Sequence, residues 1–269
     1  MKRISEQPRE NKKIFFLVAM PRSGNTLFAS IINQNPKIAC TANSITFEIY
    51  KEIGLLKQSD TFINYPDHKS LNNVLDSVYE MYYKHWPQEV ILDRGPTTPT
   101  NINLLNKHFR QPIRGVIIWR DLLDVLASYI KWFENEPTAF INKNFNTIEE
   151  KLLELMHKNG AISRELAAIH YILNSEYKEK FYLVRYEDLV TKPKETITGV
   201  YDFLGLNHYD HRYTNLDQFE LNGISYDDTI VGKNMHTIKT ELKLESNPYK
   251  KMIPQSIIDR YEHIKIFRK

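Results

Sequence analysis

The sequence predicts an α/β protein: a parallel sheet flanked by helices, in a single domain that ends in an irregular C-terminal extension. Short apolar runs alternate with longer segments of helical periodicity, which is typical of this fold class. The run 14–19 is apolar at every position, as expected for a strand buried on both faces. A length of 269 residues fits one large domain. We expect residues 1–13 to form a mobile tail and residues 14–269 to form the domain.

Four strands are expected, because four apolar runs end in turn or charged residues. They lie at 14–19, 90–92, 113–119 and 181–184. The first helix should begin near Thr26 and must end before Pro36. After the third strand, Asp121 can cap an amphipathic helix that extends to Phe133.

Three further helical regions complete the expected domain. One covers about 147–178 and should break near Gly160. Another begins at Pro193, a residue favoured in the first turn, and ends at Gly205, a residue favoured just after the last turn. The chain beyond about residue 206 is polar and irregular, with a last helix after Pro254.

The composition excludes several classes of protein. Hydrophobic residues make up 42% and charged residues 26%, which is ordinary for a globular domain and unlike collagen or a disordered chain. The net charge of +3 argues against a nucleic-acid partner. Cys40 is the only cysteine, so the chain forms no internal disulfide and no multi-thiolate zinc site. The nine histidines show no metal-ligand spacing, and we expect no metal.

The sequence also predicts a cytoplasmic protein without a membrane span. The longest apolar run, 14–20, is about a third of the roughly 20 residues that a bilayer requires. The charged first residues contain no apolar core of a signal peptide. A single thiol is consistent with a reducing compartment.

The turn between the first strand and the first helix is a candidate anion site. Backbone N–H groups converge at a helix start, and the helix dipole adds positive potential there. Gly24 permits tight curvature, Arg22 supplies a charge, and Ser23, Asn25 and Thr26 supply side-chain donors. An ordinary strand-to-helix turn is the alternative. The segment is not a Walker A loop, because it is shorter and its cation precedes the glycine.

This turn resembles the 5′-phosphosulfate-binding loop of the sulfotransferase family. Segment 16–27 is closest to the P-R-S-G-T-T version of tyrosylprotein and many bacterial sulfotransferases, with Asn25 in place of the first Thr. Further matches follow in chain order. Arg120 and Ser128 are similar to the 3′-phosphate segment, where a Ser stands eight residues after an Arg. About two helical turns separate them, so both can flank one phosphate. Taken alone, Arg120 would be read as an ion-pair partner of Asp121 or Asp124.

Two more segments agree with the resemblance. Residues 186–189 resemble the family's Y-E-D-L, and Pro193 with 203–206 resembles its P and F-L-G-L. Residues 93–96 look like its D-K-x-P element, with Arg94 in place of Lys. The family implies a single α/β domain related to P-loop kinases. It also implies 3′-phosphoadenosine 5′-phosphosulfate (PAPS) as the co-substrate that donates the sulfuryl group, and an alcohol, phenol or amine acceptor.

The resemblance assigns roles to individual residues. Arg22 is expected at the leaving phosphate and the sulfuryl group, with Arg94 in support, and residues 23–26 at the 5′-phosphate. Arg120, Ser128 and Tyr186 join the nucleotide contacts, and Lys233 adds a cation near the nucleotide. Because a sulfuryl group carries less charge than a phosphoryl group, arginines can suffice without a metal ion.

The general base is where the sequence departs from the family. Tyrosylprotein-type enzymes carry a Glu about where this chain has Asn43, and cytosolic small-molecule enzymes place a His where it has Gly95 to Thr97. The nearest carboxylate, Glu48, stands in a T-F-E stretch found in some heparan-type sulfotransferases. We therefore take Glu48 as the candidate catalytic base, with Asp93 second. A solvated Glu48 and a structural Asp93 are the alternatives.

Two other functions remain open, and so does the acceptor. The strand 117–119 with Asp121 allows a P-loop-like nucleotide kinase, although no Gly-Lys-Ser/Thr is present. A non-catalytic nucleotide-binding module is the second alternative. The acceptor could be a small molecule, a carbohydrate, a lipid headgroup or a peptide. An aromatic cluster at Tyr79, Tyr82, Tyr83 and Trp86 fits core packing or the wall of an acceptor pocket.

Overall fold

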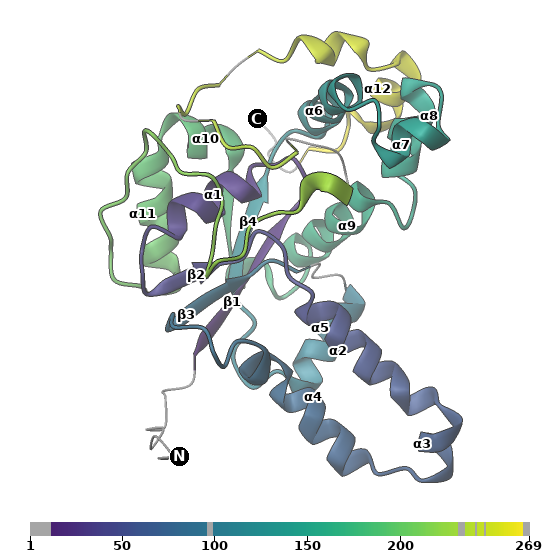
Figure 1. The fold of residues 1–269 in the computed structure, drawn as a ribbon, viewed down its shortest axis with the longest axis vertical. Helices are drawn as coiled ribbons and strands as arrows, with labels where there is room; N and C mark the ends of the chain where they lie inside the picture. The colour runs from purple at the N-terminus through teal and green to yellow at the C-terminus, as the bar shows by residue number, and fades with distance from the viewer. Residues whose placement is uncertain (1–11, 96–98, 231–234, 240, 245, 266–269) are drawn as a thin grey trace.

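A computed structural model describes residues 12–95, 99–230, 235–239, 241–244 and 246–265. The centre is a five-stranded parallel sheet in the order β2-β3-β1-β4-β5 (Figure 1). The strands are β1 (Lys13–Ala19), β2 (Ile38–Cys40), β3 (Val90–Asp93), β4 (Gly115–Trp119) and β5 (Phe181–Arg185). The α/β fold class predicted from the sequence is confirmed.

Four of the five strands match the expected ones, and each differs in extent by a residue or two. β1 begins at Lys13, inside the segment expected as a tail, and the Lys12 side chain donates to the carbonyls of Trp86 and Gln88. The strand missing from the prediction is β2, which has only three residues and pairs with β3 at the edge of the sheet.

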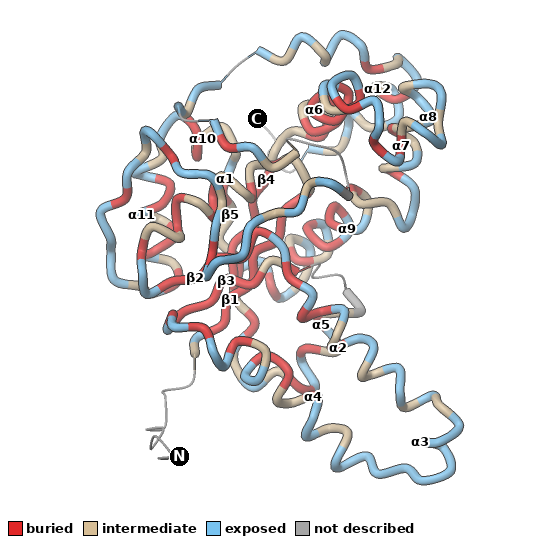
Figure 2. The backbone as a smooth tube through the Cα atoms, viewed as in Figure 1, coloured by how far each residue is buried: buried red, intermediate tan, exposed pale blue. Residues whose placement is uncertain are grey.

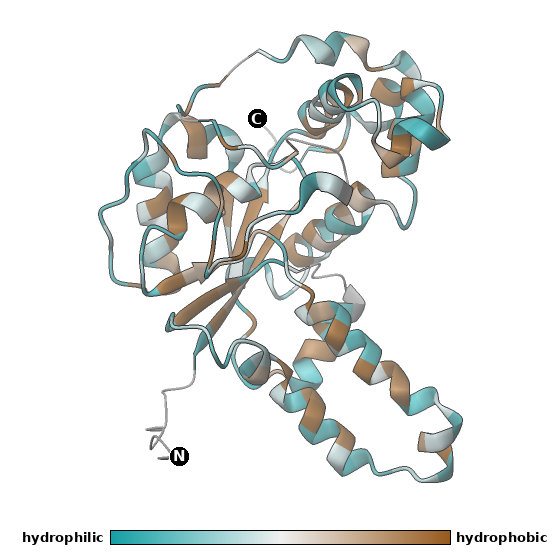
Figure 3. Cartoon of the chain, in the orientation of Figure 1, coloured by the Kyte–Doolittle hydropathy of each residue, from teal (hydrophilic) through white to brown (hydrophobic). Residues whose placement is uncertain are grey.

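Strand β1 lies at the centre because it pairs with β3 on one side and β4 on the other. Its side chains alternate between two cores. Phe15 and Leu17 pack on the side of α1 (Asn25–Ile32) and α11 (Pro193–Leu204), while Phe16 and Val18 face the other large cluster. The apolar strands therefore form the buried centre of the molecule, as Figures 2 and 3 show.

The helices follow the expected pattern with one large addition. The helix after β4 is α6 (Leu122–Asn135), and Asp121 accepts from the N–H groups of Leu123 and Asp124, as predicted. The region 147–178 divides at Gly160, as expected. The helices between β4 and β5 and the short helix after β5 are α7 (Phe140–Asn144), α8 (Ile148–Leu155), α9 (Ala161–Leu173), η2 (Lys178–Lys180) and α10 (Tyr186–Thr191).

The addition is a helical arm inserted between β2 and β3. It consists of α2 (Thr46–Leu55), η1 (Leu56–Gln58), α3 (Asp60–Asn64) and α4 (His68–Tyr82), and it extends away from the sheet (Figure 1). Most of its outer half is exposed (Figure 2). Helix α5 (Pro99–His108) packs against α2 and α4 and so closes the base of the arm.

Beyond α11 the described chain is irregular, as the sequence predicts. It contains η3 (Asp228–Ile230), η4 (Pro248–Met252) and α12 (Gln255–Tyr261). Both η4 and α12 pack against α6. Within the described part of the chain, every helix is too short or too polar to cross a membrane.

Candidate functional site

The loop between β1 and α1 presents an uncapped helix start at the carboxyl end of the central strand. Gly24 is the residue before α1, and no side chain caps the helix there, whereas Asp121 caps α6. The first-turn N–H groups therefore remain available to a ligand. Arg22 and Gly24 both have a left-handed φ, 66° and 92°. For Arg22 this backbone is strained by about 1–3 kcal/mol, and such strain concentrates at functional sites.

The Arg22 side chain is a partly buried cation, and among the described residues its hydrogen bonds go to neutral groups. Its Nε donates to Ser128 Oγ at 3.1 Å, and its Nη1 donates to the carbonyl of Met235. Burial lowers the pKa of Arg22. Among the described residues, no carboxylate forms an ion pair with it. A desolvated charge without a counter-ion favours the binding of an anion.

Arg120 and Tyr186 support the same loop from two other strand ends. Arg120 Nη1 donates to the carbonyl of Arg22 at 2.9 Å, and its guanidinium lies 4.3 Å from the centre of the Tyr186 ring. That ring also lies against Gly24, where an added Cβ would come within 2.6 Å of Tyr186 Cδ2. The alternative reading of Arg120, an ion pair with Asp121 or Asp124, is not what the structure shows, because Lys250 pairs with both carboxylates.

The segment 22–26, the phosphate loop, also contains Ser23, Asn25 and Thr26. Ser23 is fully buried, and its Oγ has no hydrogen-bond partner in the part of the chain that the structure describes. An unpaired buried hydroxyl costs about 1–3 kcal/mol, which a phosphate oxygen would recover. Asn25 is buried, and the Thr26 side chain acts against the burial that raises the pKa of Tyr226. The described loop thus fits the phosphate of the expected co-substrate.

Arg94 reaches the same edge of the sheet from the end of β3. Its Nη2 donates to the carbonyl of Ala19 at 3.2 Å, and its Nη1 donates to Asn43 Oδ1 at 3.3 Å. Nη2 also lies 3.8 Å from Glu165 Oε1. The two candidate catalytic arginines, Arg22 and Arg94, therefore both lie at the carboxyl end of β1.

Two buried residues at this edge are absent from the sequence-based candidates. Glu165, on α9, is buried, and desolvation raises its pKa although the charge of Arg94 opposes this. Burial raises the pKa of Tyr129 to about 12, and both Arg22 and Arg94 act against that shift. Glu165 shares the buried face of α9 with Ile162. An acidic residue on an apolar helix face was the signal that could have identified it.

The two candidate bases occupy contrasting positions. Glu48 is exposed in the first turn of α2, and its charge contributes to the raised pKa of Glu165. Asp93 is fully buried and accepts hydrogen bonds from Thr46 Oγ1, at 2.6 Å, and from the Tyr83 hydroxyl. Burial raises the pKa of Asp93. Asp93 therefore ties the two ends of the helical arm to β3.

The C-terminal segment covers the loop with three linked side chains. The ring of Tyr226 stacks on His236 at 3.6 Å with an interplanar angle of 4°. Asp228 accepts from the His236 backbone N–H at 3.1 Å, and its Oδ1 lies 2.5 Å from Nδ1. Burial lowers the pKa of His236, and Asp228 opposes this. No sequence pattern marks these residues, and Lys233, the cation expected nearby, lies outside the described residues.

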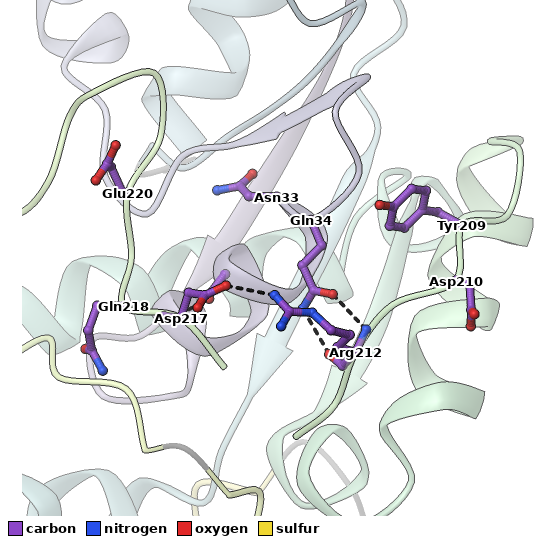
Figure 4. Close-up of a pocket in the computed structure, with 9 residues that line it drawn as sticks. Asn33, Gln34, Tyr209, Asp210, Arg212, Asp217, Gln218 and Glu220 are labelled. Carbon is purple, nitrogen blue, oxygen red and sulfur yellow. Dashed lines mark hydrogen bonds and ion pairs between the residues drawn. The ribbon is translucent and has the colours of Figure 1, made fainter. Parts of the chain in front are cut away.

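Two cavities differ in their relation to this edge. The larger, about 380 Å³, lies between α1 and the segment 209–220 (Figure 4). Ser30, in the last turn of α1, and Asn33 and Gln34, which follow that helix, line this cavity. They lie roughly 10 Å along the helix axis from the phosphate loop. The smaller, about 110 Å³, lies beside Asn43, and Tyr82, Tyr83 and Trp86 contribute to its wall. Of the four residues of the aromatic cluster, Tyr79 does not line this cavity. It packs in the core, to which Tyr83 and Trp86 also belong.

The comparisons with known proteins bear on the identity of this site. The profile of the sulfotransferase family matches residues 15–211, which span the loop, Arg94, Arg120, Ser128 and Tyr186. The chain belongs to the sulfotransferase family. No curated protein sequence matches this sulfotransferase. Across its described residues, no group of three or more His, Cys, Asp or Glu side chains is arranged to hold a metal ion.

Two solved sulfotransferase structures are similar to this chain. A sulfotransferase from Alicyclobacillus acidocaldarius is 13% identical, with a TM-score of 0.52, and the match covers 95% of this chain and 92% of that one. The sulfotransferase domain of the Synechococcus PCC 7002 olefin synthase is 18% identical, with a TM-score of 0.49, over 100% of this chain and 94% of that one. At these identities the likeness to the first structure supports the fold alone.

Proposed function

We propose that this sulfotransferase moves a sulfuryl group from PAPS to a hydroxyl or amine acceptor by in-line transfer. The observation that supports this proposal is Arg22, a partly buried cation beside an uncapped helix start, with no carboxylate ion-paired to it among the described residues. The family supplies the reaction class, and this site supplies positive charge where the reaction requires it.

The bound donor supplies a sulfuryl group on a phosphate leaving group: its S–O bond to phosphate breaks as a new S–O bond to the acceptor oxygen forms. Negative charge then grows on the bridging and equatorial oxygens. Arg22 and Arg94 stabilise that charge, and residues 23–26 bind the 5′-phosphate through N–H and hydroxyl groups. The side chain of Arg22 is positioned by its hydrogen bond to Ser128. The side chain of Arg94 is positioned by its hydrogen bonds to Ala19 and Asn43.

The nucleotide is selected by a second group of residues. Arg120 donates to the Arg22 carbonyl and lies on the Tyr186 ring, and Ser128 accepts from Arg22, so these three residues lie together beside Arg22 and would bind the 3′-phosphate. We include Lys233 on the resemblance alone. The single, buried Cys40 is consistent with a cytoplasmic protein, and we propose that location.

The acceptor must lose a proton, and we propose Glu48 as its general base. Glu48 is solvent-accessible, and its charge acts on Glu165, which in turn faces Arg94. An exposed carboxylate can be approached by an acceptor, whereas Asp93 has no exposed surface.

Ligand-dependent thermal unfolding tests the donor assignment. Adenosine 3′,5′-bisphosphate at about a hundred times its dissociation constant should stabilise the fold by roughly 2.7 kcal/mol, and ATP far less. Equal stabilisation by ATP would favour a nucleotide kinase. Stabilisation by the bisphosphate without turnover of PAPS on any acceptor would instead favour a non-catalytic binding module.

A further inference from the structure

The smaller cavity has a wall of preorganised aromatic side chains. Tyr83 lies edge-on to both Tyr82 and Trp86, with ring centres 4.9 and 4.7 Å apart. The opposite wall comes from the C-terminal segment and consists of Phe219, Leu221 and Ile224. Contacts of this kind hold the rings in place before a ligand arrives, so little side-chain entropy is lost on binding.

The cavity adjoins the reaction centre on two sides. Asn43 lines it and accepts a hydrogen bond from Arg94. Phe219 also lines it and packs on Tyr226, with ring centres 5.4 Å apart, and the Thr26 side chain of the loop acts on the pKa of Tyr226. A molecule seated in the cavity can therefore point one polar group toward Arg94.

The chemistry of the lining restricts the occupant. None of the described side chains that line the cavity carries a charge. Tyr83 donates to Asp93, and Ser44 lies 2.9 Å from Thr46 Oγ1, so both hydroxyls already have partners in a buried network. A charged or polyhydroxylated group would lose its hydration there without a replacement, whereas an apolar group gains by burial.

The size of the cavity narrows the class further. An apolar cavity of about 150 Å³ can hold benzene. The cavity beside Asn43, at about 110 Å³, is smaller than this, so it can accommodate at most one ring or a short branched alkyl group. We infer that the acceptor of this enzyme is a neutral phenol or alcohol whose hydroxyl is carried on an apolar group the size of a phenyl ring. This inference rests on the proposed function, and it excludes carbohydrate and acidic peptide acceptors.

A panel of acceptors with labelled PAPS tests this inference on the full-length protein. Phenol and benzyl alcohol are compared with 4-hydroxybenzoate, which adds one carboxylate, and with glucose. Since even one buried methylene changes kcat/KM by roughly 10–200-fold, we expect at least a tenfold preference for the neutral aromatic acceptors.

A charge placed at the rim of the cavity should invert this preference. Ile224 lines the cavity and is 56% exposed, so Ile224→Lys should fold. It should lower kcat/KM for phenol and raise it for 4-hydroxybenzoate. Ile63→Lys, at a 64% exposed position on α3, is the matched control and should change neither value.

The outcomes separate this inference from the function on which it rests. Bisphosphate binding with transfer mainly to glucose or 4-hydroxybenzoate would overturn the acceptor assignment and leave sulfuryl transfer intact. The same ratio of activities in Ile224→Lys and wild type would also overturn it. Absence of both bisphosphate binding and transfer would overturn the proposed function, and the acceptor assignment with it.

Discussion

Replacing Gly24 by Ala should damage both the stability of the protein and the phosphate loop. The φ of 92° costs a non-glycine residue about 1–3 kcal/mol. The new Cβ would also lie 2.6 Å from Tyr186 Cδ2, an overlap that typically costs a further 1–3 kcal/mol or so. We therefore expect the free energy of unfolding to fall by about 2–6 kcal/mol, measured by urea denaturation.

Two other glycines separate the contributions of backbone and ring. Gly205 and Gly223 have φ values of 66° and 77°, and an added Cβ at either position meets no atom within 4 Å. Alanine at these positions should cost only the backbone term, about 1–3 kcal/mol. The difference between Gly24→Ala and these controls measures the overlap with Tyr186.

The same substitution should weaken nucleotide binding. If Tyr186 moves to make room, Arg120 loses the ring on which it lies. Loss of one charge-assisted contact corresponds to about 1.5–3 kcal/mol, or a roughly 10- to 100-fold weaker affinity for the bisphosphate by calorimetry. A Gly24→Ala protein as stable as Gly205→Ala, with unchanged affinity for the bisphosphate, would refute this account of the loop.

Four further results are expected. Arg120→Ala should weaken binding of the bisphosphate but hardly affect adenosine 5′-phosphosulfate in calorimetry; equal losses would make Arg120 structural. Glu48→Gln should lower turnover by about 10²–10⁴-fold at unchanged bisphosphate affinity, and near-normal turnover would exclude it as the base. Transfer should persist in excess chelator, in contrast to a magnesium-dependent kinase. Finally, burial lowers the pKa of His211 and His236, so the unfolded chain binds protons that the folded chain does not. The free energy of unfolding should therefore fall as the pH drops below about 6.5. The fall should be smaller in His211→Gln than in the wild type, and urea titrations at pH 7.5 and 5.5 would measure it.

The sequence predicted elements best where one local pattern decides the structure. Strands β1, β3 and β4 are largely buried on both faces and β5 is partly buried, and the apolar runs of all four are visible without knowledge of their neighbours. Strand β2 has three residues and depends on its pairing with β3, so no local signal marks it. A helix was expected around Tyr79 to Trp86, but the rest of the arm was not predicted, because its outer elements η1 and α3 contain no buried residue and so carry no apolar pattern.

The candidate site, too, could be predicted only where its residues lie close together in the sequence. The phosphate loop is contiguous in the chain, so Arg22 to Thr26 could be found from one motif, and Arg120 and Ser128 from another. The structure adds that both motifs converge on Arg22. Glu165, Tyr226 and His236 come from separate helices and loops, and only the folded chain brings them to this edge. The base remains a prediction for the same reason.

The position of the helical arm divides the site into halves of unequal local stability. The proposed donor half rests on β1 and β4 within the sheet and on β5 at its edge, whereas the proposed acceptor half includes Tyr82 and Tyr83 at the end of the arm. The arm is joined to the sheet through Asp93, which binds Thr46 and Tyr83, and its far end is solvated. Backbone amides of α3 and the outer turns of α2 and α4 should therefore exchange with deuterium faster than those of β1. Opening of the arm would loosen the acceptor cavity while the phosphate loop keeps its shape, so acceptor and product can exchange while the nucleotide stays bound.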